Sequence, residues 1–162
     1  MARVKRIGSS RAGYHLFVSN SWRDFNQNLI QDMRAHGGRP TSGPFLGRDV
    51  LILSTKGAKT GAIRENPLAY SRDNGHYVVI ASRGGSPKNP AWYHNLRANP
   101  VVIVEVLGDR FDALAEVIDG EDYERLYQHH ARLMPAFNEY RKRTSRKIPV
   151  IVLERIEPEG RG

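Results

Sequence analysis

An Asn-Gly dipeptide between two runs of strand-forming residues is the feature that most constrains the fold of this chain. Asn74-Gly75 follows an expected strand at 66–72 and precedes another at 76–82. Asn-Gly between such runs is the strongest local signal for a two-residue β-hairpin turn. The sequence therefore predicts an antiparallel strand pair near the centre of the chain.

The segments around this hairpin complete the expected architecture. A Gly-Asp turn at 108–109 predicts a second hairpin, and one further strand is expected at each end of the region. The expected strands are 49–55, 66–72, 76–82, 100–107, 110–118 and 148–156. The expected helices are 20–36, 90–99, 119–133 and 135–143. We predict an α+β fold, a closed or nearly closed barrel of about six mainly antiparallel strands with peripheral helices.

The chain has 162 residues, which suits a single domain, residues 1–162, with one hydrophobic core. Residues 1–19 mix basic and small side chains with few apolar ones, so we expect a flexible N-terminal arm there. From Trp22 onward, apolar side chains recur on one helical face, which predicts an amphipathic helix at 20–36 with its N-cap among residues 19–21. The barrel is expected at 45–156.

A formal net charge of +8, from 25 Lys and Arg against 17 Asp and Glu, favours an acidic partner. Nucleic acid, anionic lipid and a polyanionic small molecule all fit this charge, and a basic surface is also a common solubility feature. The basic run at 141–147 is the candidate for nucleic acid phosphates, although it lacks interleaved aromatic residues. The N-terminal arm is the candidate for a peripheral membrane contact.

Other classes of protein are excluded or disfavoured. The absence of cysteine excludes disulfides, thiolate metal sites and cysteine nucleophiles. No pair of the six histidines has zinc-site spacing, so we predict no metal. Neither an NTPase phosphate-binding loop nor a Gly-x-Ser-x-Gly nucleophile motif is present. The sequence contains no apolar run of bilayer length and no secretory signal, so we expect a cytoplasmic location, with membrane association through the arm left open.

Two glycine-containing loops and the helix after them carry the residues best suited to binding a ligand. The loop at 54–64 combines Lys and Arg with hydroxyls and glycines, as an anion site does, and a solvated loop with ordinary surface charges fits it as well. In the loop at 82–86, Ser82 precedes two glycines that let a flat ligand approach, and a plain turn is the alternative. Asn95 shares a helical face with Trp92, and a ring with carbonyl and N–H groups would supply partners for its amide.

Three blocks of the sequence resemble the deazaflavin (coenzyme F420)-dependent nitroreductase family of actinobacteria. The blocks are TKGAKTGAIRENPLAY at 55–70, VVIASRGGSPKNPAWYHNLRANP at 78–100 and RTSRKIPVIVLE at 143–154. The resemblance covers roughly residues 45–155. It implies a split β-barrel of the flavin-reductase, FMN-binding-like type that binds coenzyme F420, whose phosphate and oligoglutamate tail would account for the basic charge.

The resemblance also implies which residues contact the cofactor. Lys59, Thr60 and Arg64 would hold the phosphate and the tail carboxylates, with Lys56 as an outer contact. This chain has Ala58 where the family usually has a basic residue. The other implied contacts are Glu65, Asn66, Pro67 and Leu68 beside the deazaflavin, Ile80, Ala81, Ser82 and Arg83 along its edge, and Ala91, Trp92, Tyr93, His94 and Asn95 on its other side.

The same resemblance implies an F420H2-dependent reductase that transfers a hydride from C5 of the reduced deazaflavin to a quinone, enone or nitro-type acceptor. Ser82 would hydrogen-bond to the ring or the acceptor, and Tyr140 would cap the pocket or relay a proton. The implied substrate pocket consists of Ala69, Met134, Phe137 and Tyr140. The family carries tyrosines around this pocket and only Tyr140 is kept here, which favours bulky apolar acceptors over nitro compounds.

Two alternatives stay open on the sequence. The first keeps the barrel but binds FMN or a tetrapyrrole, or carries its ligand without turnover. The second is a basic module that binds nucleic acid or a membrane surface. Under the leading hypothesis we expect a small-molecule hydride acceptor as the partner, no nucleic acid, and a monomer or a homodimer.

Overall fold

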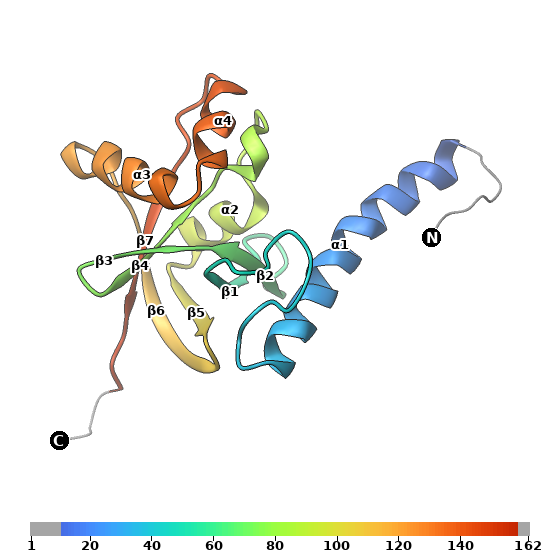
Figure 1. Ribbon diagram of the computed structural model, residues 1–162, viewed down its shortest axis with the longest axis horizontal. Helices are drawn as coiled ribbons and strands as arrows, with labels where there is room; N and C mark the ends of the chain where they lie inside the picture. The colour runs from blue at the N-terminus through green and yellow to red at the C-terminus, as the bar shows by residue number, and fades with distance from the viewer. Residues whose placement is uncertain (1–10, 159–162) are drawn as a thin grey trace.

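Seven strands form one antiparallel sheet in the order β2-β1-β5-β6-β7-β4-β3, with helices packed around it (Figure 1). The computed structural model describes residues 11–158, with side chains from residue 22 onward. The strands are β1 (Val50–Lys56), β2 (Ile63–Ala69), β3 (Ser71–Asp73), β4 (His76–Ile80), β5 (Val101–Val106), β6 (Asp109–Val117) and β7 (Val150–Arg155). The helices are α1 (Arg11–Ala35), η1 (Arg83–Gly85), α2 (Ala91–Ala98), α3 (Glu121–Leu133) and α4 (Ala136–Lys142).

The sheet curls into a barrel whose two edges meet at Tyr70. β2 and β3 lie at opposite ends of the strand order, yet only Tyr70 separates them along the chain. The Tyr70 side chain is buried in the main core, and its amide continues the pairing beyond β2 by donating to the carbonyl of Asp49 at 3.1 Å. This confirms the predicted α+β barrel. The strand expected at 66–72 is in fact two strands, because the chain bends at Tyr70 and changes its pairing partner.

The central hairpin is confirmed in detail. Asn74 and Gly75 both have positive φ, +51° and +80°, as the turn type typical of two-residue hairpins requires. Asp73 pairs with His76 directly across the turn, and β3 pairs with β4 in antiparallel register. Local turn chemistry therefore fixes the register of this edge of the barrel.

Strand alternation divides the apolar residues between the barrel interior and two outer layers. Along β1, Leu51 and Leu53 point into the interior, whereas Val50 and Ile52 point outward and pack on α1. The α1 residues in that outer layer are Leu29, Ile30 and Met33. On another part of the barrel, α3 covers the outer side of β4 and β7 through Leu126 and Tyr127. Figure 1 shows α3 and α4 together, well separated from α1.

Helix α1 begins at Arg11, earlier than the expected start near residue 20. No proline interrupts this stretch, so the residues expected to cap the helix at 19–21 lie within it. The helix extends away from the barrel toward its N-terminal end (Figure 1), while Arg34 at its other end pairs with Glu65 and Glu105. The part of the predicted arm before Arg11 lies outside the described residues. Among the described helices, none has the length and apolar character needed to cross a bilayer.

Candidate functional site

The loop between β1 and β2 is a compact turn whose backbone is partly satisfied internally. The amide of Gly57 donates to the carbonyl of Ala62 at 2.7 Å, and the amide of Gly61 donates to the carbonyl of Gly57 at 2.9 Å. Gly61 has a φ of +76°, a conformation that favours glycine. The turn therefore presents Lys59 and Thr60 between two strands that pair along their whole length.

Asn95 fastens this loop to α2. Its Oδ1 accepts a hydrogen bond from the amide of Ala58 at 3.0 Å, and its Nδ2 donates to Oγ1 of Thr55 at 3.1 Å. Asn95 and Thr55 are both buried. The interpretation that a ligand ring supplies the partners of Asn95 is therefore corrected, because α2 packs against the end of β1 and the chain itself supplies them. The amide of Ala58 is likewise already engaged.

Three cations surround the loop without an anionic partner. The side chains of Lys56, Lys59 and Arg64 are exposed. Within residues 22–158, none of the three forms an ion pair or a side-chain hydrogen bond, whereas surface cations such as Arg34, Arg125 and Arg155 do. Positive side chains on a glycine-flanked turn match the donor set that phosphates and carboxylates require.

Strand alternation separates the predicted contacts on β2 into two groups. Arg64, Asn66 and Leu68 share one face of the strand, because successive residues point to opposite sides. Glu65 lies on the other face, where its carboxylate pairs with Arg34 of α1 at 2.6 Å. The carboxylate of Glu65 thus joins α1 to the barrel, and the cofactor contact expected of Glu65 stays a prediction.

The second predicted loop makes a left-handed turn against α4. Arg83, Gly84 and Gly85 have successive φ values of +48°, +63° and +85°. A Cβ placed on Gly85 would lie 2.7 Å from the carbonyl oxygen of Tyr140, so α4 packs directly on this turn. Ser82 is buried at the start of the turn. The structure thus brings the two predicted catalytic residues, Ser82 and Tyr140, onto contacting elements.

Phe137 and Tyr140 form the best-defined part of the predicted substrate pocket. Their rings meet edge to face with centroids 5.1 Å apart, and Phe137 lies 4.5 Å from the ring of His130. Nδ1 of His130 is 2.8 Å from Oγ of Ser71 in a buried hydrogen bond. Ala69 lies two positions before Ser71, and both side chains point to the outer side of the barrel. Ala69, Phe137 and Tyr140 therefore lie on the outer side of the barrel rather than in its interior.

His130 and Met134 are buried next to Phe137. Burial lowers the pKa of His130 to about 4, with a smaller contribution from neighbouring His129, so the ring is neutral near pH 7. Among the described residues its Nε2 has no hydrogen-bond partner. The amide of Met134 donates to the carbonyl of His130 at 3.0 Å, and its side chain is buried at the end of α3.

The aromatic residues of α2 are core residues. Trp92 and Tyr93 are buried among the side chains of the barrel interior, as residues at helical spacing usually are. Ala91 and His94 are the exposed members of the predicted set on this helix. On β4 and just after it, Ile80 faces the α3 layer and Ala81 faces the interior. Trp92 and Tyr93 can therefore contribute to the site through their backbone and by packing beneath it, but not through exposed side chains.

The basic run at 141–147 is occupied within the protein. Three of its cations pair with acidic side chains, and two donate to carbonyls of the loop at 81–89. The pairs are Arg141 with Glu124, Lys142 with Glu139 and Lys147 with Asp119, and the two donors are Arg143 and Arg146. Because all five cations of this run have partners within the protein, the run offers no free cation for nucleic acid phosphates.

Arg146 and its partner Asn89 are the residues at this site that sequence reasoning missed. The acceptors of Arg146 lie 57 to 65 positions earlier in the chain, so no local periodicity indicates the contact. One signal was present. The run at 141–147 contains no acidic residue, so its cations must find partners elsewhere in the fold.

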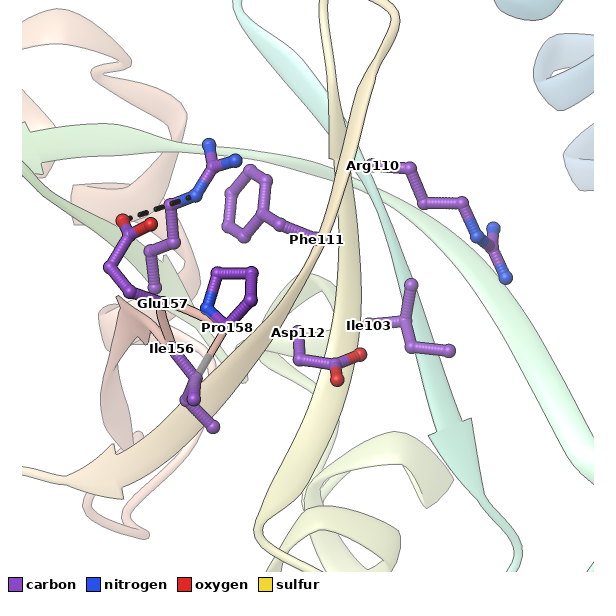
Figure 2. A pocket seen from close by; sticks show the side chains of 8 residues that line it. Ile103, Arg110, Phe111, Asp112, Ile156, Glu157 and Pro158 are labelled. Carbon is purple, nitrogen blue, oxygen red and sulfur yellow. Dashed lines mark ion pairs between the residues drawn. The ribbon is translucent and has the colours of Figure 1, made fainter. Parts of the chain in front are cut away.

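A separate hollow of about 570 Å³ lies beside β5, β6 and the residues after β7 (Figure 2). Its cations are already paired, Arg110 with Glu105 at 2.8 Å and Arg155 with Asp109 at 2.7 Å. None of its lining residues belongs to the predicted site. Across the described part of the chain, no group of three or more His, Asp or Glu side chains could hold a metal ion.

Comparison with known proteins relates this chain to one family. Residues 27–155 match the family model described as F420H(2)-dependent quinone reductase. The F420H(2)-dependent quinone reductase Rv1261c of Mycobacterium tuberculosis is 44% identical over 108 residues, which cover 65% of this chain and 72% of that protein.

Solved structures agree with this result. An F420-H2 dependent reductase, FDR-A, superposes with a TM-score of 0.61 at 38% identity, covering 66% of this chain and 95% of that one. A structure described as a domain-swapped dimer superposes with a TM-score of 0.62 at 31% identity and covers 88% of this chain and 99% of that one. A haem-binding protein of Mycobacterium smegmatis, with a TM-score of 0.55 at 17% identity, shares the fold alone.

Proposed function

The chain belongs to the F420H(2)-dependent quinone reductase family, and we propose that it transfers a hydride to a quinone, an enone or another bulky apolar acceptor. As a member of this family it is an F420-dependent oxidoreductase whose cofactor is reduced coenzyme F420, with a quinone as acceptor. We assign cofactor binding to the barrel at residues 45–156.

The observation that carries the proposal is the contrast in how the cations are used. Lys56, Lys59 and Arg64 have no ion pair within residues 22–158, whereas every cation of the run at 141–147 has a partner. A cofactor with a phosphate and a carboxylate tail needs the first kind of cation. Lys59, Thr60 and Arg64 are therefore proposed to hold the phosphate and tail, with Lys56 as the outer contact. Ala58 contributes the shape of the turn, since its amide already donates to Asn95.

The ring of the cofactor is proposed to lie between the β1–β2 loop and the loop at 81–89, next to α2. Asn66 and Leu68 would line one side with their side chains and Pro67 with its backbone. The segments 80–83 and 91–95 would form the edge and the other side. Reduced F420, when bound, supplies a hydride from C5 of its deazaflavin ring. The chain contributes a shaped, partly apolar surface that orients the acceptor and excludes water.

Ser82 and Tyr140 are the proposed catalytic residues. Ser82 would donate a hydrogen bond to the ring or to the acceptor, and Tyr140 would cap the pocket or deliver a proton. Their elements touch, because Gly85 of the Ser82 loop packs against the carbonyl of Tyr140. Ala69, Met134 and Phe137 offer no hydroxyl to the acceptor. We therefore expect quinones and enones to be reduced faster than nitro compounds.

Two measurements test the proposal. Titration of the purified protein with F420 should quench tryptophan fluorescence with saturation at or below about 10⁻⁵ M, a free energy near 7 kcal/mol that a few charged contacts can supply. Binding should weaken as salt rises, because the tail contacts are exposed ion pairs. Oxidation of F420H2, followed by absorbance, should depend on an added naphthoquinone. A protein that binds FMN instead, or that leaves F420H2 unoxidised with quinone present, would contradict the proposal.

A further inference from the structure

Arg146 is enclosed by backbone oxygens of the loop that follows β4. Its Nε donates to the carbonyl of Ser86 at 2.8 Å, and its Nη2 donates to the carbonyls of Ser82 at 2.8 Å and Ala81 at 3.3 Å. Its Nη1 donates to Oδ1 of Asn89. One side chain between α4 and β7 therefore contacts both ends of the loop at 81–89.

The loop needs such an external partner because its own backbone is strained. Arg83 has a φ of +48°, an uncommon conformation for a residue with a Cβ, and two glycines with positive φ follow it. Arg143 adds a hydrogen bond to the carbonyl of Gly84 at 3.2 Å. Convergent carbonyls stabilise a guanidinium, and the planar fork of the guanidinium in turn fixes where those carbonyls lie.

Arg141, Lys142 and Lys147 pair with carboxylates, whereas neither Arg146 nor Arg143 does so among the described residues. Arg141, by contrast, forms a bidentate contact with Glu124 at 2.7 and 2.8 Å. Burial, together with nearby Arg83, lowers the pKa of Arg146 from its usual value, and the guanidinium stays charged near pH 7. A partly buried cation without a counter-ion is costly to keep for stability alone.

We infer that Arg146 is a positioning residue for hydride transfer, which sets the conformation of the loop at 81–89 and couples that loop to α4. Through this contact Ser82 and Arg83 keep a fixed position relative to Tyr140. The inference rests on the proposed function of Ser82 and Arg83 at the edge of the cofactor ring. A lysine at this position keeps the charge but cannot donate to the four acceptors at once.

The test compares Arg146→Lys with Arg141→Lys, a matched variant in the same run that does not contact the loop. Limited trypsin digestion of the protein without cofactor reports loop order through the cleavage rates after Arg83 and Lys88. In Arg146→Lys we expect cleavage about fivefold faster and F420 binding about tenfold weaker, as loss of hydrogen bonds to a charged group implies. Arg141→Lys should change neither quantity. Asn89→Ala removes one acceptor and leaves the cation in place. It should also speed cleavage and weaken F420 binding, but by smaller factors than Arg146→Lys.

Several outcomes would overturn the inference. Equal trypsin rates in wild type, Arg146→Lys and Asn89→Ala would show that the loop does not depend on this contact. A loosened loop with unchanged F420 affinity would remove the positioning role. If the wild type fails to bind F420, the proposed function is wrong, and the digestion comparison still decides whether Arg146 orders the loop. Should Arg146→Lys not fold, Asn89→Ala carries the same comparison.

Discussion

Two basic segments of this protein have similar composition and opposite roles. The β1–β2 loop region, residues 56–64, and the run at 141–147 each concentrate Lys and Arg within a few positions. In the first, the cations project into solvent without an ion pair in the described part of the chain. In the second, each cation contacts a carboxylate, a side-chain amide or a carbonyl of the fold. One segment is available for an acidic ligand, and the other holds elements of the protein together.

This difference shows that the number of Lys and Arg residues in a segment does not tell whether they bind a ligand or stabilise the fold. What separates the two segments is the supply of acceptors around them. The loop region joins the paired strands β1 and β2, and Glu65, the acidic residue next to Arg64, is already paired with Arg34. The 141–147 run begins in the last turn of α4 and contacts both Glu124 of α3 and the loop at 81–89. Substitutions in the second segment should therefore change stability first, and substitutions in the first should change ligand affinity first.

The largest expected effect comes from Gly85→Ala, which disturbs the packing between the loop at 81–89 and α4, next to the run at 141–147. A Cβ at Gly85 would lie 2.7 Å from the carbonyl oxygen of Tyr140 and 2.9 Å from Cβ of Arg143, and φ is +85°. We expect a loss of about 3 kcal/mol in the free energy of unfolding, from strain and overpacking together. Urea denaturation measures it.

Gly84→Ala is the matched control for this prediction. Gly84 also has positive φ, but nothing lies within 4 Å of an added Cβ. Its cost should be about 1 kcal/mol, the backbone term alone. Equal losses for the two variants would mean that α4 does not pack on the loop as described.

Removing the free cations of the first segment should give the next largest effect. In Lys59→Ala with Arg64→Ala, F420 affinity should fall about 30-fold at low salt, or about 2 kcal/mol for two exposed charged contacts. The difference should shrink as salt rises. The free energy of unfolding should stay within about 0.5 kcal/mol of wild type, because neither side chain has an ion pair or side-chain hydrogen bond to lose within residues 22–158.

The control for this pair removes the same charge from the other segment. Lys142→Ala with Lys147→Ala loses two exposed cations whose partners are Glu139 and Asp119. Its F420 affinity should match that of the wild type. If both double variants bind F420 equally weakly, net charge rather than the β1–β2 loop governs affinity, and the assignment of Lys59 and Arg64 is wrong.

The sequence predicted features that depend on neighbouring residues and missed those that depend on distant ones. Asn74-Gly75 indicated the central hairpin because turn conformation is a local property. The closure of the barrel at Tyr70 depends on which strands finally pair, and nothing around Tyr70 encodes that. Asn95 shows the same limit at the site. Its burial on a helical face was foreseeable, whereas its partners, Thr55 and Ala58, come from the other side of the fold.

Asn95→Ala should lower both stability and F420 affinity, because Asn95 is a buried residue that hydrogen-bonds to the β1–β2 loop. The change leaves the Ala58 amide and the buried Thr55 hydroxyl without their partner, so unfolding should become easier by about 1.5 kcal/mol. F420 affinity should fall as well, since the loop loses its tie to α2. Asn138→Ala on exposed α4 serves as the control and should alter neither quantity. A drop in stability without any change in affinity would separate the loop from cofactor binding.

The smallest effect concerns acid, and it tests whether the pairs of the second segment stabilise the fold at all. The hydrogen bonds from Arg141 and, secondly, Gln128 lower the pKa of Glu124 to about 2 from 4.5. A carboxyl with a depressed folded-state pKa adds stability that is present above pH 4.5 and is lost as pH falls toward 2. Because more than half of the Glu124 side chain is exposed, solvent screening reduces this contribution to about 0.5 kcal/mol. Urea denaturation should show wild type above Glu124→Gln by that amount at pH 6, with the gap closing progressively below pH 4.5. The Lys59 and Arg64 double variant should show no such closing, because those cations have no carboxylate partner within residues 22–158. A gap that persists in Glu124→Gln at low pH would mean that the variant loses packing rather than charge.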